Sequence, residues 1–110
     1  MSLVNEQWAF LQDVARLLAY IAEQGLVATG GELWRSPEQQ EIYLSTGRSK
    51  TRNSYHLKRL AIDLNFIEGG QLAECPEHVG AYWESLTPEV NVWGGRWQSP
   101  YDHGHFERRV

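Results

Sequence analysis

The chain has 110 residues, a length that suits one domain with its own hydrophobic core. Hydrophobic residues make up 42% of it and charged residues 22%, a balance typical of globular proteins and unlike that of disordered chains. The net charge of −4 argues against a nucleic-acid partner, because basic patches supply most of the affinity for DNA and RNA. The single cysteine, Cys75, excludes an internal disulfide.

No membrane span or signal peptide is visible in the sequence. None of its apolar runs has the length that a membrane span needs. The first residues, 1–7, lack the basic segment and the apolar stretch of a signal peptide. We therefore expect synthesis in the cytoplasm, and release by another component if the target lies outside the membrane.

Apolar residues at helical spacing predict a first helix over residues 5–24. Asn5 can cap its start, and Gly25 ends it. The apolar positions that recur along this helix are Trp8, Leu11, Val14, Ala15, Leu18, Ile21 and Ala22.

The next segments predict a short strand and a second helix. Residues 26–34 are typical of a strand that two adjacent glycines interrupt. Ser36 as a capping residue and Pro37 at the first helical position predict a helix that ends near Ser45. The polar and basic stretch over residues 48–55 is typical of a loop.

The clearest strand signal lies over residues 60–66. Apolar residues alternate there with other residues, so they share one face of a strand. The opposite face carries Asp63, and a charged side chain at such a position needs a partner or a cleft. The apolar face consists of Leu60, Ile62, Leu64 and Phe66.

The second half of the chain predicts a turn at residues 69–70, a third helix over 76–86, and short strands over 91–93 and 105–108. Together the elements predict an α+β fold in which about three helices pack with a small antiparallel sheet. We expect residues 1–110 to form a single domain.

Histidine and aspartate occur in two segments with the spacing of metal ligands. His56 precedes Asp63 by seven residues, and Asp102 precedes His105 by three. Zinc sites use imidazole nitrogens and carboxylate oxygens, and a catalytic zinc ion has three protein ligands and one open position. A turn between Asp102 and His105 would direct both side chains into one site, whereas a regular strand would separate them.

Each candidate also has a structural interpretation. His56 and Asp63 could form an ordinary hydrogen-bonded pair, and Asp63 could instead form a buried salt bridge with Arg35 or Arg59. The other candidates are interpreted as two surface histidines and a structural thiol, namely His78, His103 and Cys75.

Three parts of the sequence resemble the signatures of one family. Residues 54–56 and 61–64 (Ser-Tyr-His and Ala-Ile-Asp-Leu) are similar to the Ser-x-His…Ala-x-Asp-Leu signature of zinc D-Ala-D-Ala carboxypeptidases and their relatives. Residues 93–97 and 102–107 resemble the closing signature of the phage L-alanyl-D-glutamate endopeptidase branch. Residues 34–50 resemble the aromatic-Arg-Ser/Thr…Gln…Tyr…Gly-Arg-Ser segment of the same group.

The resemblance implies a Hedgehog/DD-peptidase-like fold and a zinc centre. His56, Asp63 and His105 would bind Zn²⁺, and Asp102 would act as the general base. Because Asp102 would not be a ligand, its loss should leave the metal bound and reduce turnover.

The resemblance also implies a substrate groove. Arg35 and Ser54 would lie in it, with Arg35 positioned to meet an anionic group or the developing oxyanion. Gly104 stands where the family often has proline, which implies a looser loop around Asp102, and His103 beside it could compete for the metal.

The function that the resemblance implies is hydrolysis of the stem peptide of bacterial peptidoglycan. The segment 93–95 favours the bond between L-Ala and D-Glu, as in phage endolysins, and removal of a terminal D-Ala is the alternative with the same zinc site. The partner would be the stem peptide, and we expect a monomer. A holin-type pore would release the protein to the cell wall.

Two readings from other classes remain. A non-catalytic module that only binds peptidoglycan, for example in a virion tail, would have no need of Asp102, and turnover distinguishes it from an enzyme. A zinc nuclease is disfavoured by the acidic pI of about 5.5 and by the lack of a basic stripe.

Overall fold

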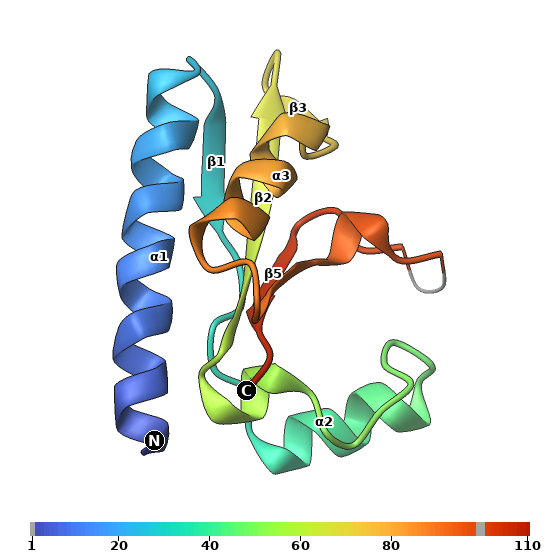
Figure 1. The fold of residues 1–110 in the computed structure, drawn as a ribbon. Coiled ribbons are helices and arrows are strands. Elements are labelled where there is room, and N and C mark those ends of the chain that lie inside the picture. The colour runs from blue at the N-terminus through green and yellow to red at the C-terminus, as the bar shows by residue number, and fades with distance from the viewer. Residues whose placement is uncertain (1, 99–100) are drawn as a thin grey trace.

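The computed structural model describes residues 2–98 and 101–110, and it has an α+β architecture (Figure 1). Within these described residues, three α-helices and two short 3-10 helices surround one small sheet of five strands. This arrangement confirms the fold class expected from the sequence. In chain order the elements are α1 (Leu3–Glu23), β1 (Val27–Gly30), α2 (Pro37–Ser45), η1 (Tyr55–Lys58), β2 (Ala61–Glu68), β3 (Gln71–Ala73), α3 (Glu77–Leu86), β4 (Asn91–Trp93), η2 (Gly94–Arg96) and β5 (His105–Arg108).

The sheet is built around β2, which is its longest strand. The strand order is β1-β2-β5-β4, with β3 also paired to β2, and every pairing is antiparallel. β5 pairs with the first half of β2 and sets Asp63 directly opposite His105. Directly opposed residues on one face of an antiparallel pair lie close together. The sheet register therefore brings these two side chains into one place.

Most of the predicted elements are present near their expected positions. α2 begins at Pro37 as expected, with the Ser36 hydroxyl accepting a hydrogen bond from the backbone N–H of Gln39 at 3.0 Å. Short strands and a third helix also form where the sequence predicts them. β3 was not predicted, because three residues are too few to show an alternating pattern. Among the described residues, no helix is both long and apolar enough to cross a membrane.

The buried face of α1 differs in part from the one that the apolar spacing indicates, because only Val14 and Ile21 of the predicted positions are buried. The helix begins at Leu3, and Ser2 caps it by accepting a hydrogen bond from the backbone N–H of Asn5 at 3.2 Å. Trp8 is 60% exposed, and Leu11 and Leu18 are each 45% exposed. The residues that reach the core are Phe10, Val14, Leu17 and Ile21.

Two carboxylates explain why the inner face of α1 was missed in part. Glu6 and Asp13 interrupt the apolar pattern, yet both are buried. Glu6 forms a buried ion pair with Arg108 at 3.0 Å. Asp13 accepts hydrogen bonds from Thr87 at 2.6 Å and from Asn91 at 3.0 Å. These partners lie far along the chain, so a pattern read along the helix alone cannot reveal them.

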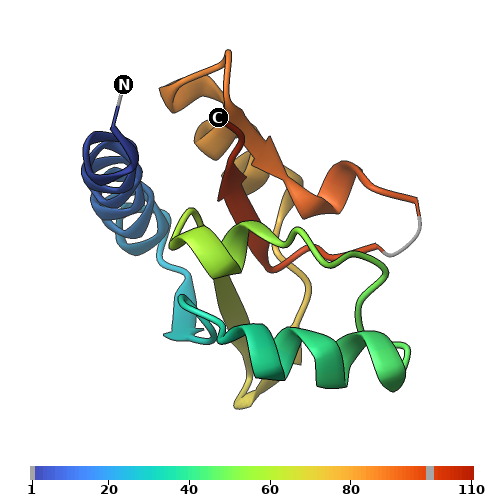
Figure 2. The ribbon, with the colours of Figure 1, turned by 90° about the horizontal axis from the view of Figure 1, so that it is seen from below.

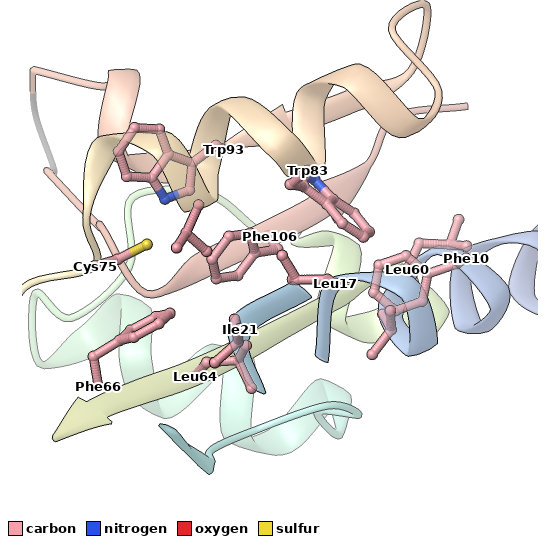
Figure 3. Packing of buried hydrophobic residues seen from close by; sticks show 12 residues of the cluster. Phe10, Leu17, Ile21, Leu60, Leu64, Phe66, Cys75, Trp83, Trp93 and Phe106 are labelled. Atoms are coloured by element: carbon pink, nitrogen blue, oxygen red, sulfur yellow. The ribbon is translucent and has the colours of Figure 1, made fainter. Parts of the chain in front are cut away.

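The core lies between α1, α3 and the sheet, and aromatic rings occupy its centre (Figure 3). Trp83 of α3 packs edge-to-face against Phe10 and Phe106, with ring centroids 5.7 and 5.9 Å apart. Its indole N–H donates to the backbone carbonyls of Val92 at 3.1 Å and Glu107 at 3.3 Å. Trp83 thereby joins α3 to the two strands that lead into and out of the 94–104 loop.

Close packing also joins α3 to β4 at a glycine. A Cβ atom added to Gly80 would lie only 2.1 Å from the ring of Trp93, which is a severe overlap. The flat face of the indole therefore rests directly on the helix backbone. This contact fixes the start of the loop that follows β4.

α2 lies apart from α1, on the other side of the molecule (Figure 1 and Figure 2). Its buried residue is Gln40, a polar one. The Gln40 amide donates to the Ser49 hydroxyl at 2.8 Å and to the backbone carbonyl of Thr51. Hydrogen bonds, rather than apolar packing, therefore attach this helix to the loop that follows it.

Candidate metal centre and active-site cleft

Three side chains from three different elements meet at the start of β2. His56 lies on η1, Asp63 lies within β2, and His105 begins β5. The Oδ1 atom of Asp63 is 3.1 Å from Nδ1 of His105 and 3.3 Å from Nε2 of His56. One possible ligand atom from each residue lies within 4.8 Å of the others. The structure thus brings together the three ligands that the resemblance implies, in a group that could hold a metal ion.

One ring nitrogen of His56 forms a hydrogen bond, and the other forms none. Its Nδ1 lies 2.9 Å from the backbone carbonyl of Leu33, which can only accept, so Nδ1 carries the proton. Its Nε2 is buried and has no hydrogen-bond partner. Buried polar atoms almost always have partners. An imidazole nitrogen that faces the Asp63 carboxylate at 3.3 Å without forming a hydrogen bond is placed where a metal ligand would be.

In His105 the roles of the two ring nitrogens are exchanged relative to His56. Its Nε2 lies 2.7 Å from Oε1 of Glu107, which leaves Nδ1 directed at Asp63. Burial acts to lower the pKa of His105, but hydrogen bonds and charges from Asp63 and Glu107 outweigh it and raise the pKa to about 9. In the absence of a metal, the ring therefore carries a second proton on Nδ1. A metal ion would take the place of that proton.

Asp63 keeps its negative charge in this environment. Burial acts to raise its pKa, but the interactions with His105 and His56 outweigh burial and hold the pKa well below its usual range. The sequence left open a salt bridge from Asp63 to an arginine. Instead, Arg35 pairs with Glu32, and Arg59 lies over the ring of Trp34.

Asp102 lies beside the three clustered residues without joining them. Its Oδ2 is 3.9 Å from Nδ1 of His105, and 47% of its side chain is exposed. A turn connects the two residues, because the backbone N–H of His105 donates to the Asp102 carbonyl at 3.1 Å. Burial raises the pKa of Asp102, and the charge of Asp63 adds to the increase against the opposing effect of His105. A carboxylate with a raised pKa next to a reaction centre suits proton transfer.

A cleft of about 460 Å³ opens beside these residues. Trp97 forms part of its wall, and its ring centroid lies 5.1 Å from that of His105. The 48–54 loop forms another part. Arg35 and Ser54, which the resemblance places in the groove, line the cleft, and so does Asp102.

Arg35 and Ser54 are held by the protein itself. The Arg35 guanidinium donates to Glu32 at 2.5 Å, to Gln40 at 2.7 Å and to the Ser54 hydroxyl at 3.3 Å. Ser54 also accepts from the backbone N–H of His56 at 3.2 Å and so caps η1. These contacts show Arg35 and Ser54 supporting the wall of the cleft and the position of His56.

The remaining histidines and the cysteine lie outside the cluster. Nδ1 of His103 accepts a hydrogen bond from the backbone N–H of Cys75 at 2.9 Å, so this atom is occupied by the protein. His78 is on the surface and shares a hydrogen bond with Tyr20 at 2.9 Å. Burial raises the pKa of the Cys75 thiol to about 12, which agrees with its structural interpretation.

Close packing, rather than flexibility, explains Gly104. This residue is buried, and a Cβ atom there would lie 2.4 Å from the carbonyl oxygen of Leu64. The Gly104 carbonyl also accepts from the backbone N–H of Leu64 at 2.8 Å. The loop after Asp102 is therefore held tightly against β2, contrary to the looser loop that the sequence suggested.

Sequence reasoning missed two supports of the site. Glu107 lies two residues after His105 on β5, so both side chains face the same way, and this period-two spacing was an available signal. The Leu33 carbonyl left no such signal, because any residue type supplies a carbonyl. The Leu33 carbonyl oxygen and Oε1 of Glu107 each accept a hydrogen bond from the histidine nitrogen that faces away from Asp63.

An α+β fold with a cluster that could hold a metal ion beside a cleft, and with a carboxylate next to it, suits a hydrolase. Residues 47–108 match the family model described as D-alanyl-D-alanine carboxypeptidase. The match spans more than half of the chain, and the protein belongs to this peptidase family.

A solved structure shares the fold over most of this chain. The crystal structure of Serratia marcescens L-Ala D-Glu endopeptidase ChiX is similar with a TM-score of 0.70 and 23% sequence identity. The likeness covers 90% of this chain and 77% of that chain. At this level of identity, the likeness shows that the two proteins share a fold. No curated protein gives a significant match to the sequence.

Proposed function

We propose that the protein is a zinc peptidase that hydrolyses the stem peptide of bacterial peptidoglycan between L-Ala and D-Glu. The observation that carries this proposal is the cluster of His56, Asp63 and His105 with Asp102 beside it in a cleft. The family match supports a peptidase. The fold shared with an L-Ala D-Glu endopeptidase and the Trp-Gly-Gly segment over residues 93–95 favour this bond.

The clustered residues suit zinc. Two imidazole nitrogens and one carboxylate are a common ligand set for catalytic zinc, and they leave one position open. The partnerless Nε2 of His56 is the observation of this structure that fits a bound ion. Bound there, zinc would act as a Lewis acid and lower the pKa of water to about 7.

The protein's own residues perform the proton transfers. Asp102 accepts a proton from the attacking water and delivers it to the leaving amine. Its raised pKa and its half-exposed carboxylate beside the cleft suit both steps. Leu33 and Glu107 keep the imidazole rings in fixed orientations during the reaction.

Removal of a terminal D-Ala is the alternative reaction at the same site, and the family description favours it. The two reactions release different products. Cleavage between L-Ala and D-Glu creates a new amino terminus on D-Glu, whereas the alternative releases free D-Ala.

The test incubates purified peptidoglycan with the zinc-loaded protein, with and without a chelator, and identifies the new termini by mass spectrometry. We expect amino-terminal D-Glu that is absent when the chelator is present. The Asp102→Asn variant is the control: it should bind zinc like the wild type and lose on the order of 100-fold or more in turnover. Release of D-Ala would select the alternative. Zinc binding without release of either product would overturn the enzyme proposal in favour of a binding module.

A further inference from the structure

The cleft concentrates positive charge in an acidic protein. The chain has 14 acidic and 10 basic residues. Four of the basic residues line the cleft, compared with only two of the acidic ones. The basic ones are Arg35, Arg48, Lys50 and Arg109, and the acidic ones are Asp102 and Glu107.

The arginines of the cleft differ in whether the protein neutralises them. Arg35 forms an ion pair with Glu32, and Arg109 forms one with Glu107. Arg48 forms no ion pair with any carboxylate of the described residues, and it is exposed. Its positive charge therefore remains available to a ligand in the cleft.

Tyr43 holds the guanidinium of Arg48 in place. The centre of that guanidinium lies 4.6 Å from the centroid of the Tyr43 ring, within the range of a cation–π contact. The Tyr43 hydroxyl donates to Glu32 at 3.3 Å, and the same ring contacts Arg35 at 4.6 Å. The ring is thus anchored to the wall of the cleft, and Arg48 rests on an ordered surface.

We propose that Arg48 is a subsite for a carboxylate of the substrate. A guanidinium binds a carboxylate through two parallel hydrogen bonds, an arrangement that lysine cannot reproduce. This inference rests on the proposed peptidase function and names the group that the cleft recognises. The D-Glu residue next to the proposed scissile bond carries a free α-carboxylate when its side chain continues the peptide, and the terminal D-Ala carries another.

The test uses three synthetic stem peptides with the sequence L-Ala-γ-D-Glu-L-Lys-D-Ala. The first has both carboxylates free, the second has the D-Glu α-carboxylate amidated, and the third has the D-Ala carboxylate amidated. Each peptide is given to the zinc-loaded wild type and to the Arg48→Gln and Arg48→Lys variants. Arg52→Gln is the matched control, because Arg52 lies on the same loop but pairs with Glu41 and does not line the cleft.

We expect Arg48→Gln to raise KM for the free peptide by about tenfold with little change in kcat, as loss of a charge-assisted contact does. For the amidated peptide that lacks the recognised group, wild type and Arg48→Gln should have the same KM. For the free peptide, the KM of Arg48→Lys should lie between those of the wild type and Arg48→Gln. The KM of Arg52→Gln should match that of the wild type. Whichever amidation removes the effect identifies the carboxylate. Equal effects of Arg48→Gln on all three peptides, or none, would overturn the inference.

The subsite can be tested even if no peptide is cleaved. The dissociation constants of the three peptides are measured by calorimetry in the Asp102→Asn background, with and without Arg48→Gln. The inference requires that Arg48→Gln weaken binding of the free peptide and leave one amidated peptide unaffected. If the wild type cleaves the peptide but Arg48→Gln does not weaken binding in this selective way, the subsite is refuted and the peptidase function is retained. If Arg48→Gln weakens binding selectively but the wild type cleaves no peptide, the peptidase function is refuted and the subsite is retained.

Discussion

At the scale of single residues, the candidate site depends on where each histidine holds its protons. His56 presents Nε2 because the Leu33 carbonyl occupies Nδ1, and His105 presents Nδ1 because Glu107 occupies Nε2. The two rings therefore use different nitrogens toward the same carboxylate. A backbone carbonyl and a carboxylate that do not contact Asp63 therefore decide which nitrogen each ring directs toward it.

The hydrogen bond from His105 to Glu107 can be tested by substitution. Glu107→Leu removes the acceptor, so zinc affinity should fall by about 10- to 100-fold. Glu107→Gln keeps an oxygen that can accept from Nε2 and should lose less affinity than Glu107→Leu. Competition with a chromophoric chelator measures both dissociation constants. Equal losses in the two variants would show that the charge of Glu107, rather than its acceptor oxygen, is what His105 requires.

The buried thiol of Cys75 provides a second test at this scale. Its pKa of about 12 leaves very little thiolate at pH 8, and the thiolate is the reactive form. Alkylation by iodoacetamide at pH 8 should therefore be far slower in the folded protein than in urea. The rate in the folded state should continue to rise as the pH increases above 9. Equal rates in the folded and unfolded protein would contradict the burial of this side chain.

At the scale of elements, the sequence predicts best where its signals are local. The alternation over residues 60–66 and the Ser36–Pro37 start each depend on neighbours in the chain, and β2 and α2 form there. α1 was predicted nearly over its full length, and Val14 and Ile21 of the predicted apolar positions are buried, but Trp8, Leu11 and Leu18 are exposed. The choice of buried face depends on Arg108 and Asn91, which lie at the other end of the chain.

A pair of substitutions in α1 tests which face is buried. Phe10 is fully buried, so Phe10→Ala should lower the free energy of unfolding by about 3–5 kcal/mol. Trp8 is 60% exposed, so Trp8→Gln should change it by no more than about 0.5 kcal/mol. Urea denaturation of the two variants measures both values. A large loss in Trp8→Gln would mean that a further surface covers this side of the helix.

At the scale of the whole molecule, the site is made by long-range pairing that no local pattern contains. Family motifs identified the candidate ligand residues, and the β2–β5 register then places Asp63 beside His105. The strand order β1-β2-β5-β4 was not predicted, because it depends on which edges meet after folding. The engagement of Arg35 with Glu32 and Gln40 was not predicted either, although these partners lie only three and five residues away in the sequence.

Because the three clustered residues come from separate elements, zinc binding should stabilise the entire fold. A ligand that binds the native state raises the free energy of unfolding by about 1.4 kcal/mol for each tenfold excess over its dissociation constant. The unfolding temperature should therefore rise as zinc is added, and it should fall back to its starting value when a chelator removes the zinc. His56→Ala should abolish the shift. An unfolding temperature that zinc does not change would argue against a site in these residues.

The contact between Gly80 and Trp93 has an evolutionary consequence. The indole occupies the space that any side chain at position 80 would need, so neither residue can change alone without disturbing the other. Among relatives that keep this fold, a larger residue at position 80 should occur together with a smaller one at position 93. Because Trp93 also donates a hydrogen bond to the His103 carbonyl at 2.8 Å, such a paired replacement should extend to the loop that carries Asp102. Three neighbouring segments between residues 80 and 103 are therefore expected to diverge together.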